Sequence, residues 1–401
     1  NLSYHFTVVD SPDINAFALP GGYIYIHRGL LAYLSSEAEL AAVLGHEVGH
    51  VTARHSVQQQ SQSTAWGILG QAVAIGTGVS AAADVTNVLG TAVVSGYGRD
   101  MELEADGLGA QYLARSGYDP QAMIEVVKVL KNQEVFARDQ AAKRGQAVPE
   151  SSYHGVFDSH PDNDRRLQEV IGPARALAGG KQEVNREVFL QHLEGLPFGD
   201  SAATGVRRGQ HFYHAELGIA LDFPAGWGLL NRPEAVIVHT ADQQAFVAMT
   251  VSAAEPGLSP EELLRQRAKG QRLVQEQTLK GGGLHGYTGI IAGTPAKRVA
   301  IIYKDSRAYQ FVAAVKGRGS LESEDQHFMQ VINSFRPLAA AEAKLAQPLR
   351  VHLRQAKAGD KMAALATASK WPDDPQATLR LLNGLYPDGE PRPGDWLKIL
   401  R

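Results

Sequence analysis

The stretch from Leu44 to His50 reads LGHEVGH and contains the motif H-E-x-x-H. Residues four apart on an α-helix lie about 40° apart around its axis, so His46 and His50 project from one face. Two imidazoles on one face can bind the same metal ion, while Glu47 beside them is placed to accept a proton rather than to bind the metal. The stretch therefore predicts a zinc-dependent peptidase centre on a helix.

A five-residue match also arises by chance in a chain with 14 histidines, but its surroundings favour the metal centre. Ser36 and Glu39 form the Ser-x-x-Glu pattern of a capping box, and Leu40 and Val43 then begin an apolar series at helical spacing. We expect a helix over about residues 36–57, with its apolar residues on a different face from the two histidines.

A catalytic zinc ion needs a third protein ligand and an open position for water. A second helix, predicted over about residues 99–116, carries Glu102 and Asp106, which are four apart and share a face. One of them can bind the metal while the other supports a ligating histidine. Glu104 is expected to point elsewhere. The alternative is an acidic helix face that only contacts solvent.

Composition narrows the class of protein. The chain has 401 residues, of which 44% are hydrophobic and 20% charged, with a formal net charge of -3. This is the composition of a globular protein of two or three domains without the charge that attracts nucleic acid, so no nucleic-acid partner is expected. Because cysteine is absent, a metal must be held by His, Asp or Glu, and the chain suits an oxidising compartment.

The pattern of strands and helices predicts a multidomain α+β protein. Residues 1–200 are expected to form a mainly helical zincin-type peptidase domain, residues 205–337 an α+β domain with an antiparallel sheet, and residues 348–401 a small module. A strand pattern follows Asn1 at once, so we expect a leader to have been removed. Residues 65–98 lack an uninterrupted apolar run of about 18 to 20 residues, so no transmembrane span is expected.

Taken together, these residues resemble the M48 peptidases, the group of CAAX prenyl endopeptidases, HtpX-type proteases and periplasmic BepA-type proteases. The resemblance covers about residues 1–195 and rests on H-E-x-x-H, on Glu102-x-x-x-Asp106 and on the upstream NAFALPGG from Asn15. It implies one Zn²⁺ per chain with Glu102 as third ligand, Asp106 in support of the ligands, and Glu47 as general base. Without transmembrane spans, the chain resembles the soluble, exported branch.

The family also carries an H-P-x-x-x-x-R element, which His160 and Arg166 match, with Arg165 one residue out of register. A cation aimed at a developing oxyanion lowers the barrier, so His160 and Arg166 are expected to contribute to catalysis. In BepA-type relatives the corresponding histidine can instead occupy the open zinc position and hold the enzyme latent. Without the resemblance, a His-Pro pair after an acidic loop is more often a turn.

Two further expectations concern the surroundings of the site. The strand of Asn15, Ala16, Phe17 and Ala18 resembles the edge strand on which such peptidases align an extended substrate by backbone pairing. His55 is five residues past His50, and we expect it to be rotated away from the site and to be either structural or exposed. Residues 65–98 correspond to the helical insertion between the zinc helices of the family. Such an insertion can act as a lid over the site.

The C-terminal segment, residues 348–401, resembles a degenerate LysM-type βααβ module. It has a G-D start at Gly359, an L-N centre at Leu382 and a P-G end at Pro393, and it departs from the usual start at Met362. A LysM-like fold implies contact with peptidoglycan, although a fold by itself does not establish a function.

The sequence thus predicts an exported metalloendopeptidase of the periplasm or envelope of a Gram-negative bacterium. Its polypeptide substrates are expected to be envelope proteins, misfolded ones among them. The alternative from another class is a chaperone-like or cell-wall-binding envelope factor whose zinc site is capped by His160.

Overall fold

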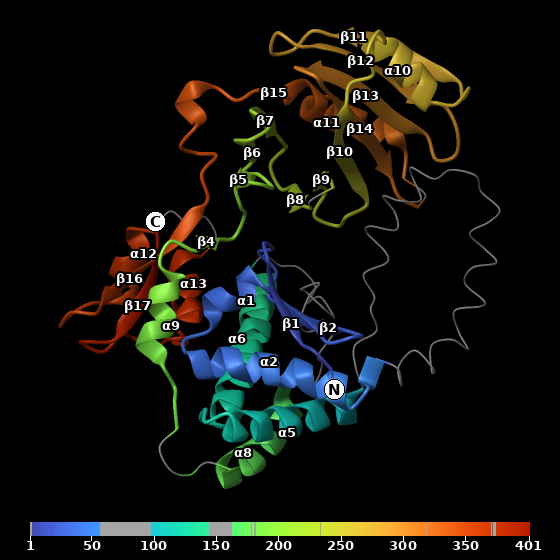
Figure 1. Ribbon diagram of the computed structural model, residues 1–401. Helices are drawn as coiled ribbons and strands as arrows, with labels where there is room; N and C mark the ends of the chain where they lie inside the picture. The colour runs from blue at the N-terminus through green and yellow to red at the C-terminus, as the bar shows by residue number, and fades with distance from the viewer. Residues whose placement is uncertain are drawn as a thin grey trace. The chain divides into compact units, whose positions relative to one another are not determined.

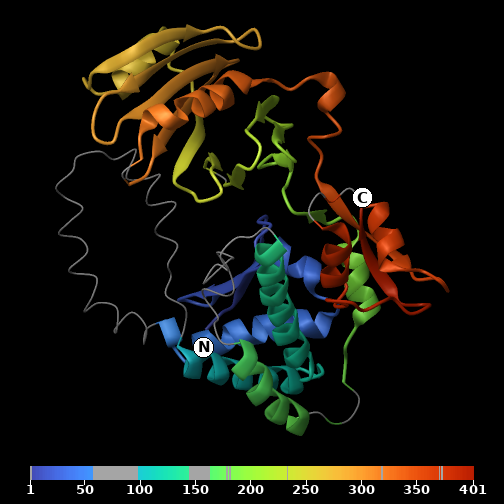
Figure 2. The same cartoon turned by 180° about the vertical axis from the view of Figure 1, so that it is seen from behind.

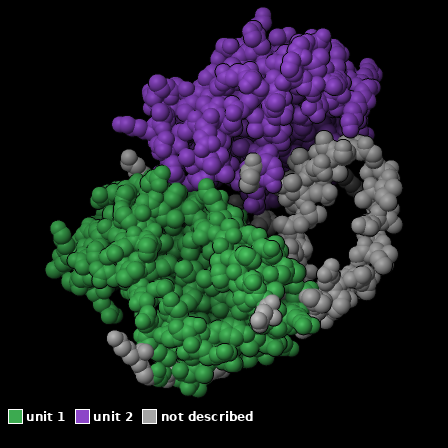
Figure 3. Space-filling view, in the orientation of Figure 1, with its two compact units in different colours: residues 1–199, 349–401 green, residues 200–348 purple. Residues whose placement is uncertain are grey.

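The computed structural model describes residues 2–56, 98–143 and 163–401, apart from residues 178, 180, 181, 233, 318, 370, 372 and 373 (Figure 1). The chain forms two compact units, one of residues 1–199 and 349–401 and the other of residues 200–348 (Figure 3). The multidomain α+β class is confirmed. The expectations for His160, and for residues 65–98 apart from Gly98, concern residues outside the described ones.

The first unit begins with a three-stranded sheet in the order β1-β3-β2. Strand β1, His5–Val9, runs parallel to β3, Tyr23–His27, and β2, Ala16–Leu19, runs antiparallel to β3. Gly22 lies in the turn that joins β2 to β3, with φ of 87°, and a Cβ there would lie 2.4 Å from the carbonyl oxygen of Ser3. Within the described residues, β2 is an edge of this sheet.

The helices of this unit are α1 Arg28–Tyr33, α2 Glu37–Thr52, α5 Arg99–Arg115, α6 Ala122–Lys143, α8 Asn163–Leu177 and α9 Arg186–Leu193. Helix α2 begins as expected, because the Ser36 side chain accepts a hydrogen bond from the backbone N–H of Glu39. The Glu39 carboxylate in turn accepts the backbone N–H of Ser35 at 2.8 Å. The helix ends at Thr52, several residues earlier than predicted.

Small residues let α2 and α5 approach closely. A Cβ on Gly49 would lie 3.0 Å from the carbonyl oxygen of Ala105, and a Cβ on Gly109 would lie 3.1 Å from the backbone nitrogen of His46. Since glycine has no Cβ, the backbones can meet where larger residues would hold them apart. This contact brings the H-E-x-x-H stretch beside the acidic residues of α5.

The C-terminal segment packs into the same unit as the peptidase-like helices. It consists of β16 Leu349–Gln355, α12 Met362–Thr367, α13 Pro375–Leu382 and β17 Trp396–Leu400. Strand β16 pairs with β17 and with β4, Pro197–Phe198. Figure 2 shows this segment, in red, beside the green helix α9 of the same unit. The fully buried Lys398 donates two hydrogen bonds of 2.8 Å to the carbonyl oxygens of Ala32 and Leu34, at the end of α1. Side chains from both parts of the chain share one hydrophobic core.

The second unit is built on antiparallel sheets. A seven-stranded sheet has the order β11-β12-β13-β14-β10-β9-β8, and a smaller one has the order β15-β7-β6-β5. Strand β13 pairs antiparallel with β14 across the turn at Asp305. The strands are β5 Val206–Arg208, β6 His211–His214, β7 Ile219–Asp222, β8 Gly228–Asn231, β9 Val236–His239, β10 Ala245–Ala253, β11 Leu273–Leu279, β12 His285–Ile291, β13 Lys297–Lys304, β14 Arg307–Val315 and β15 Arg336–Pro337.

Helices α10, Pro260–Arg267, and α11, Leu321–Ser334, complete the second unit. The buried face of α11, which includes Phe328 and Ile332, belongs to the main core of this unit together with Phe311 of β14. Among the helices that the structure describes in either unit, none is both long and apolar enough to cross a membrane.

The buried Lys398 makes the packing of the C-terminal segment testable. Burial lowers the pKa of Lys398 to about 7, and the charge of Glu39 opposes this only in part. In an unfolded chain the pKa of lysine is about 10.4, so between about pH 8 and 10 the unfolded state keeps a proton that the folded state has lost. The free energy of unfolding should therefore rise with pH in this window, by up to about 1.4 kcal/mol per pH unit.

Replacing Lys398 by Met removes the titrating group. In Lys398→Met the free energy of unfolding should therefore lack this rise with pH. Denaturant unfolding at the two ends of the window measures it. Lys357→Met is the matched control, because Lys357 is an exposed lysine of the same segment and should leave the slope unchanged. Equal slopes in the wild type and Lys398→Met would contradict the burial of this ammonium group.

Candidate metal centre

His46, His50 and Glu102 form a buried cluster whose donor atoms all lie within 4.8 Å of one another. The Nε2 atoms of the two histidines are 2.9 Å apart. The Glu102 carboxylate faces both, with Oε2 at 3.6 Å from His46 Nε2 and Oε1 at 3.4 Å from His50 Nε2. Two imidazole nitrogens and one carboxylate oxygen that converge in this way are the donor set of a catalytic zinc site, so these residues fit the ion.

Asp106 orients the ring of His46 through a hydrogen bond with its Nδ1 atom. The Nδ1 atom of His46 lies 2.8 Å from Asp106 Oδ1, which leaves Nε2 facing Glu102. Arg166, on α8, donates from Nε and Nη2 to the two carboxylate oxygens of Asp106, each at 2.8 Å. The Nη1 atom of Arg166 lies 3.3 Å from Glu102 Oε2. The guanidinium therefore contacts both acidic residues of α5, Asp106 and Glu102.

Charge pairing dominates the electrostatics of this buried group. Burial raises the pKa of Asp106, but the charge and hydrogen bonds of Arg166, with a further contribution from His46, lower it well below its usual range. Burial lowers the pKa of Arg166, but the Asp106 carboxylate raises it by more, and Glu102 and Glu47 add to this. Both groups therefore stay ionised.

Glu47 is the next residue of α2 after His46, and its side chain is buried beside the cluster. Its carboxylate lies close enough to contribute to the pKa of Arg166. It is not one of the three residues that converge on the metal position. An ionised carboxylate beside that position can accept a proton from a reacting water molecule.

The prediction for His55 is wrong. His55 is fully buried, and its Nδ1 atom lies 2.9 Å from Nδ1 of His50. The helical spacing that would rotate it away does not apply, because α2 ends at Thr52 and Arg54 adopts a left-handed conformation with φ of 57°. His55 Nε2 in turn lies 3.2 Å from Glu104 Oε2. Glu104 therefore contacts His55, but it is not among the three residues that converge on the metal position.

Six predicted site residues are thus brought together in one buried group from three helices: His46, Glu47, His50, Glu102, Asp106 and Arg166. Arg165 is out of register, as expected, and is partly exposed beside Glu169 and Asp100. Arg166 contacts the two carboxylates of α5, and its role toward an oxyanion stays a prediction. His160 lies outside the described residues.

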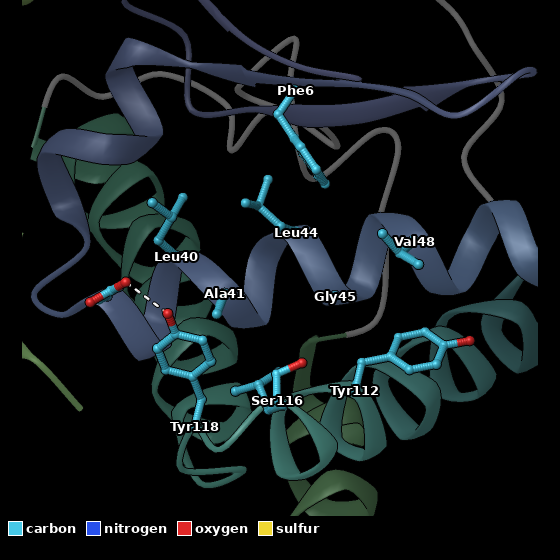
Figure 4. A pocket seen from close by; sticks show the side chains of 11 residues that line it. Phe6, Leu40, Ala41, Leu44, Gly45, Val48, Tyr112, Ser116 and Tyr118 are labelled. Carbon is cyan, nitrogen blue, oxygen red and sulfur yellow. Dashed lines mark hydrogen bonds between the residues drawn. The ribbon is translucent and has the colours of Figure 1, made fainter. Parts of the chain in front are cut away.

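A cavity of about 380 Å³ lies against a different face of α2 (Figure 4). Its lining includes Leu40, Leu44 and Val48 of α2, together with Phe6 of β1. These three α2 residues follow one another at intervals of four and lie on the far side of the helix from His46. The expected separation from the histidines therefore holds for Leu40 and Leu44 but not for Val43, which is seven residues before His50 and lies about 20° from it around the helix axis.

The residues around the metal position lie in a stretch that is similar to a known protein family. Residues 1–174 match the model of peptidase family M48. This region contains every residue of the cluster described above.

Several curated proteins are similar to the chain. It is 38% identical to the beta-barrel assembly-enhancing protease of Escherichia coli K12 over 264 residues, which cover 63% of this chain and 51% of that protein. It is 38% identical to the protein of the same name from Yersinia pestis, covering 43% of this chain and 35% of that one. It is also 38% identical to the mitochondrial metalloendopeptidase OMA1 of Arabidopsis thaliana, covering 32% of this chain and 26% of that one. The chain spans about half or less of the length of these relatives.

The pairing of Arg166 with Asp106 predicts a large effect of removing the guanidinium. Arg166→Met leaves buried carboxylates without their cation, which typically costs about 3–5 kcal/mol. Denaturant unfolding of the metal-free protein measures this loss. The neighbouring Arg165→Met is the control, since its partly exposed ion pairs should contribute less than about 1 kcal/mol. Similar stabilities of the two variants would show that the buried pair does not stabilise the fold.

Proposed function

We propose that this protein is a zinc-dependent endopeptidase with His46, His50 and Glu102 as the ligands of one Zn²⁺ per chain, which the match of residues 1–174 to peptidase family M48 supports. The observation that carries the proposal is the convergence of two imidazole nitrogens and one carboxylate at a single buried position. The donor set supports zinc over magnesium or calcium, which prefer oxygen ligands. The names of the relatives, protease and metalloendopeptidase, support peptide-bond hydrolysis.

Different residues around the metal position have different roles in the proposed hydrolysis. When bound, zinc supplies a Lewis acid that polarises the scissile carbonyl and acidifies a water molecule. Glu47 accepts the proton of the attacking water and returns it to the leaving amine, as a general base and then a general acid. Asp106 fixes the tautomer of His46, and Arg166 keeps Asp106 ionised. His160 is proposed to act near the open zinc position, either on the oxyanion or as a latch.

Strand β2 is proposed to align the substrate. It packs along α2 and, among the described strands, pairs only with β3. Its opposite edge offers backbone groups to an extended polypeptide, and such pairing tolerates many sequences. The proposed contacts come from Ala16, Phe17 and Ala18 of this strand and from Asn15, which directly precedes it.

We propose that the chain has three domains. Residues 1–200 form the peptidase domain, residues 205–337 form the α+β domain, and residues 348–401 form a LysM-like module. The order of β16, α12, α13 and β17 supports the βααβ comparison. We further propose that this module contacts peptidoglycan, and a pull-down with the purified polymer tests this contact. We also propose an exported, periplasmic location and envelope-protein substrates, because the name of the bacterial relatives refers to beta-barrel assembly.

The role of Glu47 gives a direct test of the mechanism. Glu47→Gln should retain zinc, because Glu47 is not a ligand, and should lower casein cleavage by about 10²- to 10⁴-fold, because the proton acceptor is lost. Metal analysis of the purified protein and a digestion assay measure the two properties. Glu37→Gln is the matched control, with the same chemical change in the first turn of the same helix.

Wild-type rates in Glu47→Gln would refute the proposed base. In the same assay Glu102→Ala should lose zinc as well as activity. His160→Ala tests latency: activity that is gained only in this variant indicates a capped site, whereas no activity in any variant favours a chaperone-like factor.

A further inference from the structure

Each proposed histidine ligand has a second ring nitrogen that needs a partner. For His46 this partner is Asp106, as described above. For His50 it is the ring of His55, 2.9 Å away. His55 is brought there by the end of α2 at Thr52 and by the left-handed backbone of Arg54, a conformation that non-glycine residues rarely adopt.

The proton positions in this contact decide whether His50 can bind a metal. A neutral imidazole carries one proton, so His50 presents a free Nε2 only when its proton is on Nδ1. That N–H must then donate to His55 Nδ1. The opposite assignment, with His55 Nδ1 as donor, places the proton on His50 Nε2 and blocks the ligand.

Glu104 selects between these two assignments. Its Oε2 lies 3.2 Å from His55 Nε2, and an ionised carboxylate can only accept a hydrogen bond. His55 therefore keeps its proton on Nε2 and offers Nδ1 as an acceptor to His50. The chain of contacts from Glu104 through His55 to His50 thus favours the one tautomer of His50 that binds metal.

We propose that His55 and Glu104 form a positioning pair that fixes the tautomer and ring orientation of the second zinc ligand. The inference rests on the proposed function, since it requires His50 to bind zinc. The pair mirrors the one on His46, where Asp106 is the acceptor and Arg166 its support. His55 is fully buried and Glu104 is 59% exposed, so the histidine carries the larger part of the effect.

The test is the zinc affinity of the purified full chain, measured by competition with a chromophoric chelator. His55→Phe keeps an aromatic ring but removes the acceptor, and it should weaken zinc binding by about 10- to 100-fold, as loss of such partners does elsewhere. His55→Asn places an amide oxygen near the position of Nδ1 and should restore most of the affinity. A merely structural role of the ring predicts the reverse order of the two variants.

A surface variant keeps the inference testable if His55→Phe does not fold. Glu104→Ala should also weaken zinc binding, by less than His55→Phe, and the control Asp100→Ala should not, although it removes the same charge from the same helix. Wild-type affinity in both His55→Phe and Glu104→Ala would overturn the pair. If the wild type itself binds no zinc, the proposed function fails instead.

The visible spectrum of the cobalt-substituted protein gives a second readout that is independent of catalysis. Cobalt absorption reports ligand geometry, so His55→Phe should change the spectrum while His55→Asn and Asp100→Ala should not. Identical spectra in the wild type and His55→Phe would show that the orientation of His50 does not depend on His55.

Discussion

The metal centre depends on the close contact between α2 and α5. Glycines on both helices, at positions 49 and 109, lie so close to backbone atoms of the other helix that a Cβ would make a tighter contact than most side chains do. Two histidines of one helix and one glutamate of the other therefore reach the same point. A larger residue at either glycine would push the two backbones apart and shift the carboxylates of α5 relative to the histidines.

Burial then determines how the charges are arranged. A carboxylate removed from water is costly unless a cation or several hydrogen bonds replace the solvent. Arg166 meets this need for Asp106 and also lies beside Glu102, which is fully buried. The same arrangement orients His46 for a metal. One buried guanidinium thus serves both the stability of the unit and the geometry of the site.

Much of this was predictable from local sequence rules. The cap at Ser36, the shared face of His46 and His50, and the i, i+4 relation of Glu102 and Asp106 all follow from helix geometry, which acts over a few residues. His55 was not predictable in this way, because its position depends on where α2 ends and on the backbone of Arg54. The packing of Lys398 beneath α1 depends on contacts between residues more than 300 positions apart, which no local pattern records.

The central claim is that His46, His50 and Glu102 hold one catalytic zinc ion. A crystal structure of the zinc-loaded protein, with anomalous diffraction measured on both sides of the zinc absorption edge, tests this most directly. The account predicts one strong anomalous peak, bonded to Nε2 of each histidine and to the Glu102 carboxylate, with a further position left for water, substrate or a capping side chain. A peak elsewhere, or no peak at full zinc occupancy in solution, would contradict it.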